Sequence, residues 1–432
     1  MSSITTTATH FLSELHTAIS NSIGKRTNTK TKTNTKTNTN SRTKRFREKG
    51  TRKQHIRTTP LTSSSSLLVP VPLTFGMYVD APTSLRHALE VKCNEHYIPS
   101  EIISVDKLNA PGATYAYATI PISGFQTPTR TFRIVMWYPP QSHSTKQVAV
   151  NMVDKMRDWL RFACGQATEC SGSVDVDVYM IMTEHKKRVS NAVVLDVLDV
   201  LDVLNVNTAF TYACGGNRTN SILVFRKEEW FKVFIHETMH CIGLDFAAKE
   251  TAAIRHKMNR RLQTLFPGTL NVSNYNITEL YAEIWADVLN VLFTSIYTNQ
   301  SWKSLLTKEQ TFSRKQANKV LAYYQMTMAD LFSSDHHHPT PYPEEKVSVF
   351  SYYLGRALVF SELTSFMQFC KTHNRTYLQF INNDANRMAF IDHVIVPSIS
   401  YYHKHTKIFT TTTTTTDTDT DTDTTLRMTC TE

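Results

Sequence analysis

The segment Lys232-Val-Phe-Ile-His-Glu-Thr-Met-His-Cys-Ile-Gly243 is the most informative part of this 432-residue chain. It contains the pattern HExxH, in which His236 and His240 are four residues apart. On an α-helix such residues lie one turn apart on one face, so both imidazoles can bind one metal ion. Glu237 lies about 100° round the helix, where it can reach a water molecule activated by the metal without binding the metal itself. We therefore predict a helix over 228–242 that carries a zinc site.

The residues around the motif indicate a buried helix with defined ends. Glu228 and Glu229 are acidic, which favours a helix N-terminus, and Gly243 is a typical helix stop. The apolar neighbours would cover several faces of the helix: Trp230, Phe231, Phe234, Ile235, Met239, Ile242 and Leu244. Two histidines and a glutamate in a buried helix need polar partners. This favours a metal site over a structural helix with histidines on its surface.

A third protein ligand is needed, because catalytic zinc sites combine three protein ligands with one open position. The predicted helix 278–297 carries Glu279, Glu283 and Asp287 at intervals of four, and such acids repel one another unless a cation faces them. We expect Glu283 to bind zinc, and Asp287 to accept the N–H of a ligand histidine. Glu279 is expected beside them, outside the ligand set. Asp245, just past the glycine turn, is the alternative third ligand.

Two parts of the sequence carry a family resemblance. HExxH followed by Glu283-x-x-x-Asp287 resembles the gluzincins, the thermolysin-like zinc metallopeptidases, in which the later helix supplies the third ligand and the Asp supports a histidine. Segments 229–246 and 278–287 also resemble zinc peptidases encoded by large DNA viruses. The metzincin pattern is not met, because the position of its third histidine is Phe246. The resemblance implies a viral zincin protease that holds one zinc per chain and hydrolyses polypeptides.

The chemistry expected of this site is hydrolysis of a peptide bond by a zinc-activated water. Glu237 would be the general base that takes the proton of the water and passes it to the leaving amine. Zincins also use a donor to the oxyanion. Candidate donors are Tyr352, Tyr353 and His337, the last within a run of three histidines.

The body of the chain changes in character near residue 226. Runs of β-branched and aromatic residues predict strands at 115–120, 131–138, 174–182 and 221–225, with a helix at 148–162. Helical periodicity then predicts helices at 228–242, 278–297, 308–332, 344–372 and 377–384. This order predicts an α+β fold that is zincin-like, with an N-terminal mixed β-sheet and active-site helix followed by a mainly helical subdomain. The strand at 209–214 or that at 221–225 would bind extended substrate by β-augmentation.

The amino-acid composition divides the chain into four regions. We expect a basic, disordered arm over 1–66 with a short helix at 10–23, a strand-rich subdomain over 67–245, a helical subdomain over 246–405 and a low-complexity Thr/Asp tail over 406–432. The net charge of +10 is misleading, because residues 1–60 carry +11 and the remainder −1. The arm is therefore the part expected to bind nucleic acid or anionic surfaces weakly. A Leu-Asp-Val repeat at 194–206 has no assigned role.

Two other functions fit the same sequence. One is a catalytically inactive scaffold that binds zinc, and the other is a protein that binds nucleic acid through its basic arm. Seven widely spaced cysteines without a CxxC pair, and no secretion signal, favour reduced thiols inside the cell. No stretch predicts a transmembrane helix. A soluble protein of the host cytoplasm or of a virion is expected.

Overall fold

The structure is a computed structural model that describes most of the chain. The described residues are 6–24, 70–94, 98–122, 129–142, 144–167, 175–189, 201, 203–212, 220–247, 250–269, 275–334, 342, 347–410 and 425–431. Most of the predicted basic arm, most of the Leu-Asp-Val repeat and the run of three histidines with His337 lie outside them.

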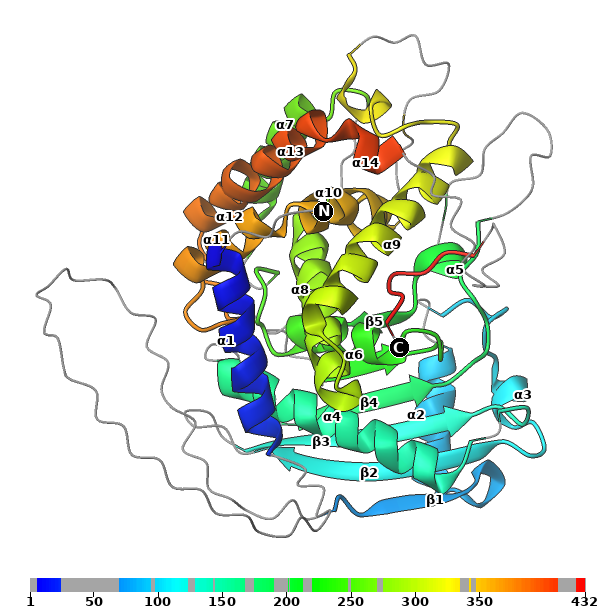
Figure 1. The fold of residues 1–432 in the computed structure, drawn as a ribbon. Helices are drawn as coiled ribbons and strands as arrows, with labels where there is room; N and C mark the ends of the chain where they lie inside the picture. The colour runs from blue at the N-terminus through cyan, green and yellow to red at the C-terminus, as the bar shows by residue number, and fades with distance from the viewer. Residues whose placement is uncertain are drawn as a thin grey trace, which may run out of the picture.

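A mixed β-sheet forms one side of the molecule (Figure 1). Its described strands follow the order β1-β2-β3-β4-β6-β5. The pairs β3–β4 and β4–β6 are parallel, and the pairs β1–β2, β2–β3 and β6–β5 are antiparallel. The strands are β1 (Leu73–Met77), β2 (Thr114–Ile122), β3 (Arg130–Tyr138), β4 (Asp175–Ile181), β5 (Ala209–Thr211) and β6 (Asn220–Val224). The strands predicted at 115–120, 131–138, 174–182 and 221–225, now β2, β3, β4 and β6, are confirmed.

Helices cover both faces of the sheet because its central strand β3 is apolar on both sides (Figure 1). Phe132 and Ile134 belong to the main core, which they share with α4, whereas Val135 and Trp137 belong to a second, smaller core shared with α2. Alternate residues of a strand point to opposite faces, so one strand contributes to both layers. The helices near the sheet are η1 (Tyr78–Asp80), α2 (Thr83–Cys93), α3 (Val105–Leu108), α4 (Lys146–Gln166) and α5 (Val203–Val206).

The helical part of the chain is built around α8 (Ile277–Thr298), which is buried over nearly its whole length. α1, α6, α9 and α10 all pack against it, and Figure 1 shows α8 among them. The described elements of this part are α1 (Thr6–Ile23), α6 (Trp230–Cys241), α7 (Ala252–Leu265), α9 (Trp302–Tyr323), η2 (Asp330–Phe332), the π-helix η3 (Phe350–Gly355), α10 (Arg356–Ser361), α11 (Leu363–His373), α12 (Asp384–Phe390), η4 (Ile391–Ile395), α13 (Val396–Lys404) and α14 (Thr406–Thr410). The strand-rich and helical parts share the main core, and the fold is of the α+β class.

Three expectations about secondary structure were wrong. Residues 377–384 form no helix, and α12 begins only at Asp384. The predicted helix 308–332 ends at Tyr323 and is followed by the short η2. The predicted helix 344–372 begins only with the π-helix η3, which continues into α10, and it is interrupted before α11, because Glu362 leaves the helical conformation and caps α11 through its side chain. In each case the segment is irregular or interrupted, but its buried apolar residues are spaced along the sequence as they would be in one continuous helix.

Both ends of the chain contribute to the folded body, contrary to the expectation of a disordered arm and a free tail. α1 buries Phe11, Leu15 and Ile19 in the main core. Near the other end, residues Thr425–Thr431, here called the C-terminal strap, run between other elements with most of their side chains buried (Figure 1). The helix predicted at 10–23 is present as α1, but low complexity in the flanking sequence hid the packing of both segments against the body.

The described part of the chain contains no helix that is long and apolar enough to span a membrane. The described cysteines Cys93, Cys164, Cys241, Cys370 and Cys430 are all free thiols.

The burial of α1 is testable by mutation. Leu15 is completely buried, so Leu15→Ala should lower the free energy of unfolding by about 2–5 kcal/mol. Asn21→Ala, on the exposed face of the same helix, should change it by less than about 0.5 kcal/mol. Urea unfolding followed by circular dichroism measures both. Equal, small effects would show that α1 does not belong to the folded body.

Candidate metal centre

The start and the end of α6 are fixed by two residues with positive φ. Glu229 precedes the helix with φ 62°, and Gly243 follows it with φ 70°. Glycine adopts this left-handed conformation without steric cost, which explains the helix stop predicted there. The turn at Gly243 brings the chain back, so that Asp245 faces the ring of His240.

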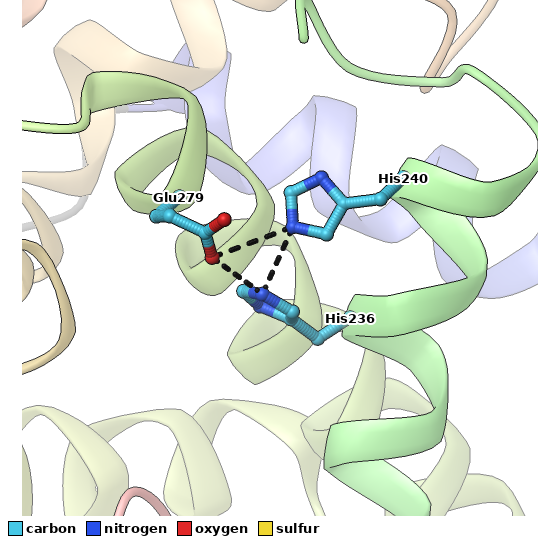
Figure 2. Close-up of side chains that lie close together, drawn as sticks. All are labelled: His236, His240 and Glu279. Atoms are coloured by element: carbon cyan, nitrogen blue, oxygen red, sulfur yellow. Dashed lines mark hydrogen bonds and ion pairs between the residues drawn. The ribbon is translucent and has the colours of Figure 1, made fainter. Parts of the chain in front are cut away.

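The two histidines of α6 meet Glu279 of α8 (Figure 2). Their Nε2 atoms are 3.0 Å apart, and Oε2 of Glu279 lies 2.9 Å from Nε2 of His236 and 3.4 Å from Nε2 of His240. The histidine side chains are 7% and 8% exposed and that of Glu279 is 20% exposed. Among the described residues, these three form the one group of histidine, cysteine or acidic side chains close enough to share a metal ion.

The other ring nitrogen of each histidine faces a second carboxylate. Oε2 of Glu283 lies 3.1 Å from Nδ1 of His236, and Oδ2 of Asp245 contacts Nδ1 of His240. At His240 the carboxylate beside Nδ1 favours the tautomer with its proton there, which leaves the Nε2 lone pair for a metal. At His236 the contact with Glu283 is an ion pair without hydrogen-bond geometry. Both Nε2 atoms therefore point at one place with the right atoms for ligation.

Glu283 and Asp287 occupy different positions from those expected. Glu283 does not join the group of three side chains; one oxygen faces His236 and the other contacts the ammonium of Lys232. Asp287 touches neither histidine. It lies 3.1 Å from Nε of Arg356 and 3.5 Å from Nζ of Lys232. These two cations, which the spacing argument did not include, neutralise the far end of the acidic face.

Asp245 also differs from its alternative assignment as a ligand. Its carboxylate is on the Nδ1 side of His240, away from the Nε2 atoms, and its other oxygen accepts the backbone N–H of Ala247. Asp245 thus lies on the Nδ1 side of His240, and Glu279 is the acid that contacts both Nε2 atoms.

Glu237 lies beside this group and faces a small cavity of about 20 Å³, which His236 and Tyr352 also line. It is 8% exposed, and no hydrogen bond or ion pair joins its carboxylate to any residue that the structure describes. Burial, only partly offset by the two histidines, raises the pKa of Glu237 to about 7. A buried carboxyl with a pKa near neutrality and no protein partner is suited to accept and return a proton.

The three candidate donors to the oxyanion lie in different places. The hydroxyl of Tyr352 donates to Oε2 of Glu279 at 3.1 Å, so Tyr352 belongs to the site. Tyr353 is fully buried near Glu229 and Arg356 and does not line the cavity. His337 lies outside the described residues.

The two candidate substrate strands are also distinguished. β6, the strand predicted at 221–225, lies between β4 and β5 in the sheet, whereas β5 is the last strand in the order. Ala209 of β5 lines the cavity beside Glu237. Of the two, β5 is the strand at the sheet edge next to the site.

Comparison of this chain with protein-family models, with curated proteins and with solved structures finds no match.

The metal-free site should make stability depend on pH. Burial alone would lower the pKa of His236, but Glu279 and Glu283 outweigh it and raise the pKa to about 9. The unfolded value is about 6.5, so this histidine stabilises the metal-free fold below pH 6.5 and that contribution is lost as the pH rises towards 9. The loss should be at most about 3 kcal/mol.

Urea unfolding of chelator-treated protein between pH 6 and pH 9.5 measures this effect. His236→Gln should flatten the decline relative to the wild type, since it removes the titrating group. A variant that declines as steeply as the wild type would show that His236 is not the source.

Proposed function

We propose that this chain is a zinc-dependent metallopeptidase that hydrolyses polypeptides. The observation that carries the proposal is the arrangement of the two Nε2 atoms and one Glu279 oxygen around a common point, with both Nδ1 atoms already facing carboxylates. Two histidines, one carboxylate and an open position make up the donor set of many catalytic zinc sites. Glu237, buried and without a protein partner among the described residues, supports hydrolysis at such a site.

The distances in this group suit zinc. Ligand atoms about 2.0–2.1 Å from a tetrahedral zinc lie about 3.3 Å from one another. The three separations here are 2.9, 3.0 and 3.4 Å. Three electronegative atoms held this close in a nearly buried site need a cation or shared protons between them, because their lone pairs repel. The residues present therefore fit the metal.

His236, His240 and Glu279 would hold the zinc, one per chain. This assignment moves the third ligand one turn earlier than the sequence argument did, from Glu283 to Glu279. The supporting acid moves with it, because Glu283 is four residues after Glu279 and faces His236. The gluzincin pattern of an acidic ligand followed four residues later by an acid that supports a histidine is thus retained as Glu279-x-x-x-Glu283, which supports a zincin-like fold.

When bound, zinc would supply a Lewis acid that polarises the substrate carbonyl and acidifies a water molecule. Glu237 would take the proton of that water and transfer it to the nitrogen of the leaving amine. Its pKa of about 7 in the metal-free protein suits both steps. Asp245 and Glu283 keep the imidazoles oriented, and Tyr352 supplies the one described hydroxyl donor that contacts the Glu279 carboxylate. Tyr352 is therefore our candidate for contact with the oxyanion.

The substrate would be an extended polypeptide that pairs with β5, which lies at the sheet edge beside the cavity. An inactive scaffold with the same metal site has no need of a buried, unpartnered carboxyl at Glu237, so the geometry favours the enzyme. The basic segment 25–66, on which a nucleic-acid function depends, lies outside the described residues. No observation favours that function.

The ligand assignment predicts a ranking of metal affinities. Glu279→Ala removes a ligand and should weaken zinc binding by more than about 100-fold, whereas Glu283→Gln disturbs only the support of His236 and should weaken it by about 10-fold. Competition with a fluorescent zinc indicator, after circular dichroism has shown that each variant is folded, gives both affinities. The opposite ranking would return the third-ligand role to Glu283.

The catalytic assignment predicts that metal binding and hydrolysis can be separated. Glu237→Gln keeps the shape of the side chain but cannot accept a proton, so it should bind one zinc per chain and lose about 10²–10⁴-fold in kcat. Zinc content by mass spectrometry and cleavage of a labelled, unfolded protein are the measurements. A wild-type protein that takes up no zinc would refute the proposal, and full activity in Glu237→Gln would refute the role of this residue.

A further inference from the structure

The end of the chain forms part of the wall beside the candidate metal centre. Met428 of the C-terminal strap lines the same cavity as His236, Glu237 and Tyr352. That cavity has a volume of about 20 Å³, and one water molecule needs about 10–15 Å³. The site as it stands has room for little more than a water molecule. A polypeptide can reach Glu237 only if part of this wall moves.

The strap is held as a peptide ligand would be held. Every backbone N–H from Leu426 to Thr431 donates a hydrogen bond. The acceptors are the Lys187 carbonyl for Leu426, Gln316 for Arg427, Glu229 for Met428 and Thr429, Glu309 for Cys430, and the hydroxyl of Thr429 for Thr431. Most of these acceptors belong to side chains of the body, so the groove recognises main chain, as sites for extended peptides commonly do.

The side chains that accept hydrogen bonds from the strap are buried, so the groove that holds it is part of the folded structure. Glu229 and Glu309 are 2% and 0% exposed. Oε1 of Glu229 receives the N–H groups of Met428 and Thr429 at 2.5 and 2.7 Å. Buried carboxylates are costly unless several donors reach them, so these two acids favour a bound segment that offers N–H groups.

The strap also borders a much larger space. Arg427 and Thr431 line a cavity of about 690 Å³ beside the first residues of α6, which Trp230 and Lys155 line as well. One side of the strap therefore faces the small cavity at the metal centre, and another faces this larger one. Movement of the strap would remove a wall from both, and the larger cavity is of a size that accommodates ligand groups.

We propose that the groove that holds Thr425–Thr431 is a peptide-binding surface of the metal centre, and that the chain's own strap occupies it as an internal inhibitor with Met428 as the residue that blocks entry. This inference rests on the proposed function for its consequence, although the closure itself does not depend on zinc. In its described residues the strap has no helix and only one β-bridge, between Thr425 and Arg188. Opening of the strap would break its hydrogen bonds with the body, including those that Asn290 of α8 donates to Thr429 and Thr431, but it would break no helix of the strap.

The closure can be tested on the full-length, zinc-free protein. Diethylpyrocarbonate modifies accessible histidines, and peptide mass spectrometry gives the rate at His236 and His240 relative to His10, whose side chain is 71% exposed. Met428→Ala removes the blocking side chain, and Leu426→Ala weakens the docking of the strap without touching the cavity. Each should increase the relative rate at least about fivefold.

Two control variants distinguish opening of the strap from a general loss of stability. Met428→Leu keeps the volume of the side chain, and Leu15→Ala destabilises the fold through α1; neither should change the rate by more than about twofold. Wild-type rates in both Met428→Ala and Leu426→Ala would overturn the proposal. So would a rate in Leu15→Ala that rises as much as theirs.

The inhibitory consequence is tested on the zinc-loaded forms of the same proteins. Met428→Ala should cleave a labelled, unfolded protein at least about fivefold faster than the wild type, with unchanged zinc content. Faster labelling without faster cleavage by an active protein would overturn the inhibitory role. A wild type that binds no zinc would instead count against the metallopeptidase proposal, and the labelling result would still decide whether the strap closes the site.

Discussion

The interaction on which this structure depends is a ladder of charged side chains between two antiparallel helices. One face of α6 presents a residue every four positions to one face of α8, where acids recur at the same interval. The facing sets are Lys232, His236 and His240 on α6 and Asp287, Glu283 and Glu279 on α8. Nearly all of these groups are buried. Such an interface is stable only if every charge has a partner of opposite sign, since desolvation of an unpaired ion costs several kcal/mol.

The two ends of the ladder meet this requirement differently. At the Asp287 end, Lys232 and Arg356 face both acids. The pKa of Glu283 is held well below its usual value because Lys232, His236 and Arg356 outweigh the effect of burial, whereas burial raises the pKa of Asp287 to about 8 in spite of Arg356 and Lys232. At the Glu279 end, the partners of the acid among the described residues are the two imidazoles and the Tyr352 hydroxyl. In the metal-free protein the positive charge comes from protons on the imidazoles, because Glu279 and Asp245 outweigh burial and raise the pKa of His240. A divalent cation could replace these protons. Under the proposed function, the ladder would therefore direct a metal to Glu279.

This division explains what the sequence could and could not predict. HExxH, Gly243 and the recurring acids are local patterns, so the metal helix, its end and its partner helix were predictable. Which of the three acids meets the histidines depends on Lys232, whose side chain contacts Glu283 and Asp287, and on Arg356, which is far along the chain and which no local pattern links to α8. A helix at 10–23 was predicted, but the packing of α1 and of the strap into the body was not, for a related reason: short packed segments beside low-complexity sequence look like parts of it, and their partners are distant residues.

The strap and the metal helix share one anchor, which has a consequence for how the site could open. Glu229 starts α6 in a left-handed conformation that costs a non-glycine residue about 1–2 kcal/mol, so surrounding contacts must hold it there. Those contacts are Lys187 on one side and the N–H groups of Met428 and Thr429 on the other. If the strap leaves, Glu229 loses two donors. An incoming peptide that offers its own N–H groups could replace them, so the groove itself favours exchange of the strap for substrate over an empty, open site.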